Sequence, residues 1–126
     1  MASHRDLDEF GAEFVANTRD LTFRMLEVLV EGRHGSEEDI RIAEGLARMT
    51  ESDRELALHL IRRFIDSSLH NVLWMIQESK RFDLVAQSPD GRLTSLTESS
   101  DGLSGEPYTE AGWYARFSKY GEADLD

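Results

Sequence analysis

The chain has 126 residues, of which 25 are acidic and 14 are basic, and it has a formal net charge of -11 and no cysteine. A domain of this length buries roughly two thirds of the surface of its unfolded chain, so it needs no disulfide or metal ion to be stable. The lack of cysteine excludes disulfides and thiolate chemistry, and the acidic balance argues against nucleic acid and anionic lipid, which bind clustered cations.

The chain up to residue 81 has the apolar periodicity of helices. Apolar residues recur at intervals of three, four and seven between residues 7 and 31, which predicts a long amphipathic helix that ends at Gly32. They are Leu7, Phe10, Phe14, Leu21, Met25 and Val28. Ser36 and Asp39 then have the spacing of a capping box, which predicts a short second helix. Its inward positions are Ile40, Ala43, Leu46 and Ala47.

A third helix is predicted to begin at Ser52, which has Glu55 three residues later, and to continue to residue 79. Its apolar positions cover most of its circumference. We therefore expect it to be the central element of the domain, with the other helices packed around it. A narrow polar strip remains along it, and consists of Glu55, His59, Arg62, Arg63, Asp66 and His70.

The next segment has the signature of a β-hairpin over residues 82–97. Pro89, Asp90 and Gly91 predict its turn, because proline presets one backbone dihedral angle and glycine accepts a positive φ. The composition of residues 98–107 predicts a loop.

The final aromatic segment, residues 113–120, alternates in part between the two faces of an extended chain, which favours a third strand. A short helix over residues 109–119, ended by Gly121, is the alternative. The fold class is therefore α+β, in one domain over residues 1–126. Its helical part spans residues 1–81, and its antiparallel sheet, loop and acidic tail span residues 82–126.

Two histidine–carboxylate pairs on the third helix are the weak candidates for chemistry. Glu55 and His59, and Asp66 and His70, are each four residues apart and lie on one side of the helix. Such pairs bind divalent metals or act as acid–base pairs. The outermost two are about 22 Å apart, so one metal cannot use all four, and the two arginines beside them oppose a cation. We therefore predict a solvated face, with no catalytic set and no metal.

No motif points to a cofactor. The sequence has no phosphate-binding glycine loop, no EF-hand spacing and no complete nucleophile elbow around Ser104.

The densest aromatic group is the candidate partner-binding site. As a strand, this segment would turn Trp113 and Phe117 toward the core and leave Tyr114, Arg116 and Tyr120 on a binding face. Residues 98–126 also carry seven acids against two bases. The candidate partner-binding residues are Tyr114, Arg116, Tyr120, Glu106 and Glu110.

Three functions are open at this point. The first is a non-catalytic protein-binding domain, such as an acidic inhibitor or immunity-type protein that neutralises a basic protein. The second is a small metal-dependent or acid–base enzyme that uses His59 or His70. The third is a homo-oligomeric scaffold, for example a homodimer, because the other elements offer little surface to surround a long and mostly apolar helix.

A cytoplasmic location is predicted, with no membrane partner. The first residues lack the apolar core of a signal peptide. The longest purely apolar run, residues 72–76, is far shorter than the roughly 20 residues that cross a bilayer. Twelve of the fourteen basic residues are arginine, which fits a GC-rich bacterial genome.

Overall fold

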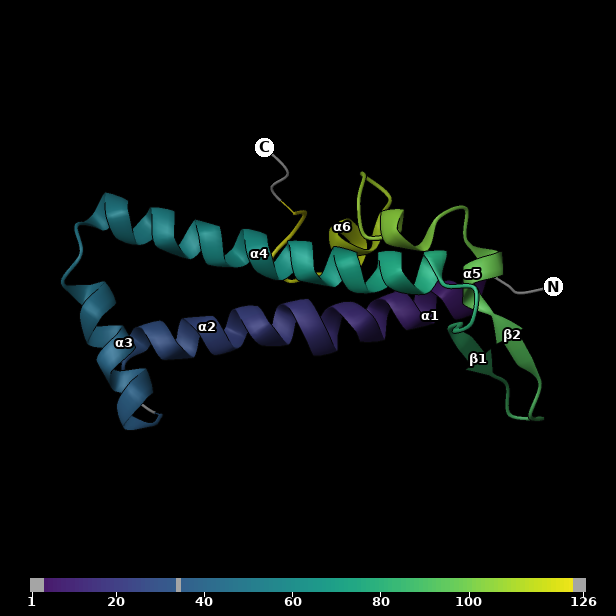
Figure 1. The fold of residues 1–126 in the computed structure, drawn as a ribbon, viewed down its shortest axis with the longest axis horizontal. Helices are drawn as coiled ribbons and strands as arrows, with labels where there is room; N and C mark the ends of the chain where they lie inside the picture. The colour runs from purple at the N-terminus through teal and green to yellow at the C-terminus, as the bar shows by residue number, and fades with distance from the viewer. Residues whose placement is uncertain (1–3, 34, 124–126) are drawn as a thin grey trace.

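The computed structural model describes residues 4–33 and 35–123, and two long antiparallel helical segments dominate it (Figure 1). The first segment runs through α1 (His4–Phe14), the π-helical turn η1 (Val15–Asp20) and α2 (Leu21–Glu31). The second is α4 (Glu51–Glu78), and the short α3 (Glu37–Ala47) connects the two at one end of the molecule.

The helix boundaries follow the local signals in the sequence, with one shift. Gly32 ends α2 in the left-handed conformation, at φ 70°. The capping box that begins α3 is confirmed: the Asp39 amide donates to Ser36 Oγ, and the Ser36 amide donates to the Asp39 carboxylate. The cap of α4 is Thr50 instead of Ser52, because Thr50 Oγ1 accepts the Asp53 amide at 3.2 Å.

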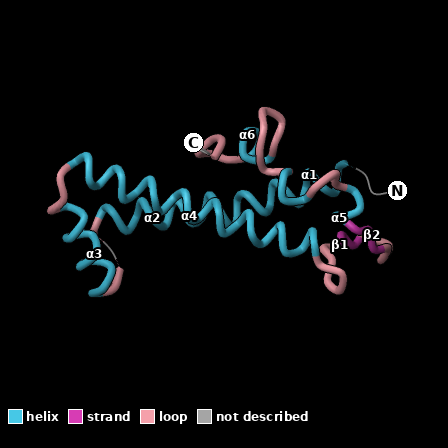
Figure 2. The backbone as a smooth tube through the Cα atoms, turned by 45° about the horizontal axis from the view of Figure 1, so that its top comes forward, coloured by secondary structure: helices cyan, strands magenta, loops and turns pink. Residues whose placement is uncertain are grey.

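The predicted β-hairpin is confirmed, and with it the α+β class. Strands β1 (Val85–Gln87) and β2 (Leu93–Ser95) pair in antiparallel register, with Ala86 opposite Thr94. Figure 2 shows this sheet at the end of the molecule opposite α3. The chain then continues through α5 (Leu96–Ser99) and the 3-10 turn η2 (Leu103–Gly105) to α6 (Trp113–Phe117).

The predicted third strand over residues 113–120 is wrong, and the alternative of a short helix describes the segment better. The reason is tertiary. The amides of Trp113 and Tyr114, in the first turn of α6, donate to the carbonyls of Glu106 and Pro107 at 2.9 and 3.0 Å. Carbonyls of the preceding loop thus satisfy the donors that a helix leaves free at its start. β-propensity gives way to such contacts because it depends strongly on context.

The main core cluster lies at one end of the helix pair, beneath the C-terminal elements. It consists of Leu7, Val15, Leu73, Leu96, Leu103, Trp113 and Tyr114. None of these residues belongs to α2, to α3 or to the first two thirds of α4. In Figure 1 the part of the molecule next to α3, beyond the C-terminal chain, has only α2, α4 and α3.

The expectation that α4 is a central, covered helix is therefore wrong. Between Leu56 and Met75 several of its large apolar side chains are exposed, because the C-terminal chain covers only one side of α4, near Asp66 and Leu73. Despite this apolar surface, no helix among the described residues has the length and the composition to cross a membrane.

Candidate functional site

The pair of long helical segments has two sides: one is covered by the C-terminal chain, and we call it the closed side, and the other is uncovered, and we call it the open side. α4 packs closely against η1 and lies further from α2. On the closed side, the C-terminal chain fills the space beside η1. On the open side, the space between α2 and α4 is a groove.

A buried ion pair fastens the closed side. Arg19 in η1 is 2 % exposed, and its Nε donates to Asp66 Oδ1 in α4 at 2.7 Å. Its Nη1 donates to Ser118 Oγ at 2.9 Å and to the Gly121 carbonyl at 2.6 Å. We call these four residues, Arg19, Asp66, Ser118 and Gly121, the clamp. It joins three parts of the chain that are distant in sequence.

The π-helical turn η1 directs Arg19 and its neighbour Asp20 toward the C-terminal chain, because a π-helical turn shifts the helical phase by one residue. Both side chains are buried. Asp20 accepts hydrogen bonds from Ser118 Oγ at 2.6 Å and from the Lys119 amide at 2.9 Å. The Arg19 guanidinium lies 4.2 Å from the centre of the Tyr114 ring and 4.8 Å from that of Phe23. These contacts hold the guanidinium between two aromatic faces.

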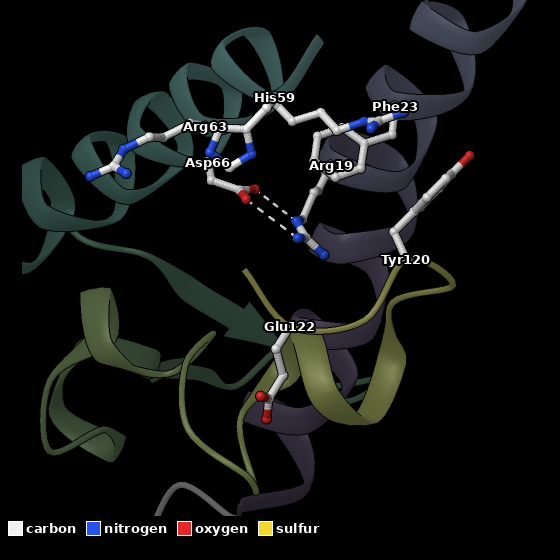
Figure 3. Close-up of a pocket in the computed structure, with 8 residues that line it drawn as sticks. Arg19, Phe23, His59, Arg63, Asp66, Tyr120 and Glu122 are labelled. Atoms are coloured by element: carbon white, nitrogen blue, oxygen red, sulfur yellow. Dashed lines mark hydrogen bonds and ion pairs between the residues drawn. The ribbon is translucent and has the colours of Figure 1, made fainter. Parts of the chain in front are cut away.

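A pocket of about 270 Å³ lies beside the clamp, as Figure 3 shows. Its lining side chains are Arg19, Phe23, His59, Arg62, Arg63, Asp66, Tyr120 and Glu122. The arginines do not converge on one point: Arg19 is bound to Asp66, and the Arg63 guanidinium points away from that pair in Figure 3. The clamp therefore has the chemistry of a structural ion pair rather than that of an anion site.

Two tyrosines beside the clamp, the fully buried Tyr114 and the half-buried Tyr108, are held neutral. Burial raises the pKa of Tyr114 far above its ordinary value, and the nearby Asp66 carboxylate adds to the shift. The pKa of Tyr108 is raised for the same two reasons. A phenol with so high a pKa is a poor acid or base near neutral pH.

The polar strip of α4 does not form one site. Glu55 and His59 are exposed, whereas Asp66 is buried in the clamp. His70 is half-buried, and its ring centre is 5.7 Å from that of Tyr108. Within the described ranges, no three His, Cys, Asp or Glu side chains are grouped so that they could hold a metal ion.

The expected aromatic binding face is wrong at Tyr114 and stays a prediction at Arg116, Tyr120 and Glu110, which are exposed. Tyr114 is fully buried in the core, which corrects the expectation that it is exposed. Arg116 pairs with Asp8 at 3.0 Å, and Glu106 accepts a hydrogen bond from Ser100 Oγ. Glu110 is exposed, and the Tyr120 ring packs edge-on against Phe23, with centres 5.2 Å apart. The end of the acidic tail, residues 124–126, lies outside the described residues.

The open side of the helix pair carries a large apolar hollow. Two adjoining hollows of about 560 Å³ each lie between α2 and α4 and share Thr22, Ile61 and Ile65. We call them together the apolar groove. Six of its large side chains are exposed: Leu21, Met25, Val28, Leu60, Ile61 and Phe64.

The outer face of α4 extends this apolar surface. At 100° per residue, the side chains from Leu56 round to Val72 span an arc of about 160°, and no charged residue falls within it between positions 56 and 75. Exposed Trp74 and Met75 belong to this arc. Polar positions on it are the uncharged Ser67, Ser68 and Asn71.

The sequence contained one signal for the groove. α4 has more apolar residues than the rest of a chain this small can cover, and this excess underlies the hypothesis of a homo-oligomer. The position of the groove was not predictable, since it depends on which side of the helix pair the C-terminal chain covers.

Comparison with known proteins gives no match: no family model, no curated protein and no solved structure is significantly similar to this chain.

Proposed function

We propose that this chain is a non-catalytic protein-binding domain, and that it binds its partner through the apolar groove. The observation that carries the proposal is the exposure of six large apolar side chains along one continuous hollow. Contiguous exposed apolar surface of this kind marks interaction sites in soluble proteins. Its aromatic and methionine side chains, Phe64 and Met25, are residue types enriched at interfaces.

The groove fits an apolar helix. Such a groove between two helices accepts the apolar face of an amphipathic helix, whose side chains repeat at intervals of three and four residues. The hypothesis of an acidic inhibitor of a basic protein stays a prediction. The part of α4 that borders the groove carries no acidic residue that would select a basic partner.

The enzymatic alternative has less support from the geometry. The clamp arginine uses its donors on Asp66, Ser118 and Gly121, and the nearby Tyr114 is neutral. Hydroxyl groups line the groove at Thr22 and Ser68, but among the described residues no histidine lines it to act as their base.

Site-specific crosslinking tests the proposal. A photoreactive phenylalanine analogue is placed at Phe64, in the groove, or at Phe82, beyond the end of α4. The two side chains are matched, at 63 % and 69 % exposed. Illumination in the native cell extract is expected to give a discrete protein adduct from position 64 and none from position 82. Equal labelling at both positions, or no adduct at either, would contradict the proposal.

A further inference from the structure

We infer that the occupant of the apolar groove is the groove of a second copy of this chain, so that the protein acts as a two-fold symmetric homodimer. The inference rests on the proposed function, because it names the partner for that same surface. Three observations lead to it: the exposed area, the arrangement of the helices, and the distribution of charge.

The exposed area of the chain is larger than that of a typical monomer of its mass. Its accessible surface is 8983 Å², whereas a folded monomer of 14.4 kDa exposes about 6,800 Å². The difference is roughly 2,000 Å² per chain. Part of it belongs to the elongated outline in Figure 1. The excess is larger than the roughly 1,000 Å² that each partner of an obligate dimer buries at the low end of the range.

The helices of the open half form an incomplete layer. Here α2 and α4 lie side by side, with α3 across their end, and neither the β-hairpin nor α6 reaches them (Figure 1). A helix pair must bury its apolar side against a further layer of structure. Two such pairs, packed groove against groove, complete a four-helix bundle with an apolar centre.

The charge on the groove permits a second copy to dock. Two chains of net charge -11 repel one another, so a self-interface must be largely neutral. Among the described residues that line the groove, the charged ones are one base, Arg24, and one acid, Asp39. A two-fold interface places the same patch on both partners, and a patch with one charge of each sign can complement itself.

Light scattering after size-exclusion chromatography tests the inference on the full chain. The wild type is expected at twice 14.4 kDa. Phe64→Glu places a charge in the groove and should raise the dissociation constant of the dimer about a hundredfold, which gives a monomer. Phe82→Glu, the matched exposed position outside the groove, should remain a dimer.

Met25→Glu is the second variant, and circular dichroism shows whether each variant keeps its helices. Met25 lines the other wall of the groove and is 62 % exposed, so the charge is tolerated in a monomer. Wild-type protein that is monomeric at all concentrations overturns the inference. So does a dimer that persists in both folded groove variants.

The two proposals fail differently. A monomer that still gives a discrete crosslink at position 64 to another protein would overturn the homodimer and leave the binding function standing. A monomer without any adduct would overturn both.

Discussion

The clamp is the residue-scale feature on which the closed side of the molecule depends. It brings Arg19 and Asp66 together across 47 positions of sequence, with both side chains largely withdrawn from water. We expect Asp66→Asn to lower the free energy of unfolding by about 3 kcal/mol, because it leaves a buried guanidinium without its counter-charge. Urea denaturation measures the change.

The control for this prediction is an exposed ion pair of similar geometry. Arg5 and Glu9 lie 3.0 Å apart, with side chains 83 % and 63 % exposed. Glu9→Gln should cost less than about 1 kcal/mol, since solvent screens the pair. Equal losses in the two variants would show that the clamp contributes no more than a surface contact.

Tyr114 gives a prediction about pH. Burial raises its folded-state pKa above the ordinary value of about 10, so the unfolded chain loses its phenolic proton first as pH rises. The stability that depends on the neutral phenol is therefore complete below pH 10 and declines above it. Tyr114→Phe keeps the ring against Arg19 and, among the described groups, loses no hydrogen-bond partner.

We therefore expect Tyr114→Phe to unfold like the wild type at pH 7 and to lose less stability between about pH 10 and 11. Chemical denaturation at each pH, followed by circular dichroism, measures the difference. An unchanged alkaline slope in the variant would mean that Tyr114 ionises in the folded chain as readily as in the unfolded one.

At the scale of elements, α6 packs closely against α1 at Gly11. A β-carbon at Gly11 would lie 2.5 Å from the Trp113 indole nitrogen, and Trp113 is fully buried. Alanine usually stabilises a helix interior by about 1 kcal/mol relative to glycine. Here the overlap should outweigh that gain, and Gly11→Ala should lower the free energy of unfolding by about 2 kcal/mol.

Gly45 in α3 is the matched control. The nearest atom to a β-carbon there is 3.9 Å away, so Gly45→Ala should stabilise the chain by its helix propensity alone. Thermal unfolding of both variants gives the comparison. If Gly11→Ala were also stabilising, the packing of α6 on α1 would be looser than the structure describes.

The sequence predicted correctly those elements whose start or turn depends on a few neighbouring residues. The capping box at Ser36 and the turn at Gly91 act within a few residues, so their residue types are sufficient. α6 was predicted less well because its first amides bond to the carbonyls of Glu106 and Pro107. The clamp could not be predicted, since no pattern within α4 reveals that Asp66 meets an arginine from η1.

At the scale of the whole molecule, the two ends differ in how completely their apolar surface is covered. One end has a core with Trp113 and Tyr114 at its centre, and the other presents the groove. Local opening is easiest where few apolar contacts must be broken. A partner that covers the groove should therefore stabilise the groove end against local opening more than it stabilises the other end. The stability of the chain then depends on association.

Electrostatics across the whole molecule gives the last prediction. Two copies at -11 each repel at long range, while the groove is mostly apolar and has one lining charge of each sign among the described residues. Raising NaCl from about 0.01 to 0.15 M shortens the screening length from about 30 to 8 Å. The dissociation constant of the homodimer, measured by sedimentation equilibrium, should therefore fall. It would rise with salt if opposite charges held the interface together, as they do when an acidic protein binds a basic one. A rise would thus show that ion pairs, rather than the apolar side chains of the groove, hold the interface together.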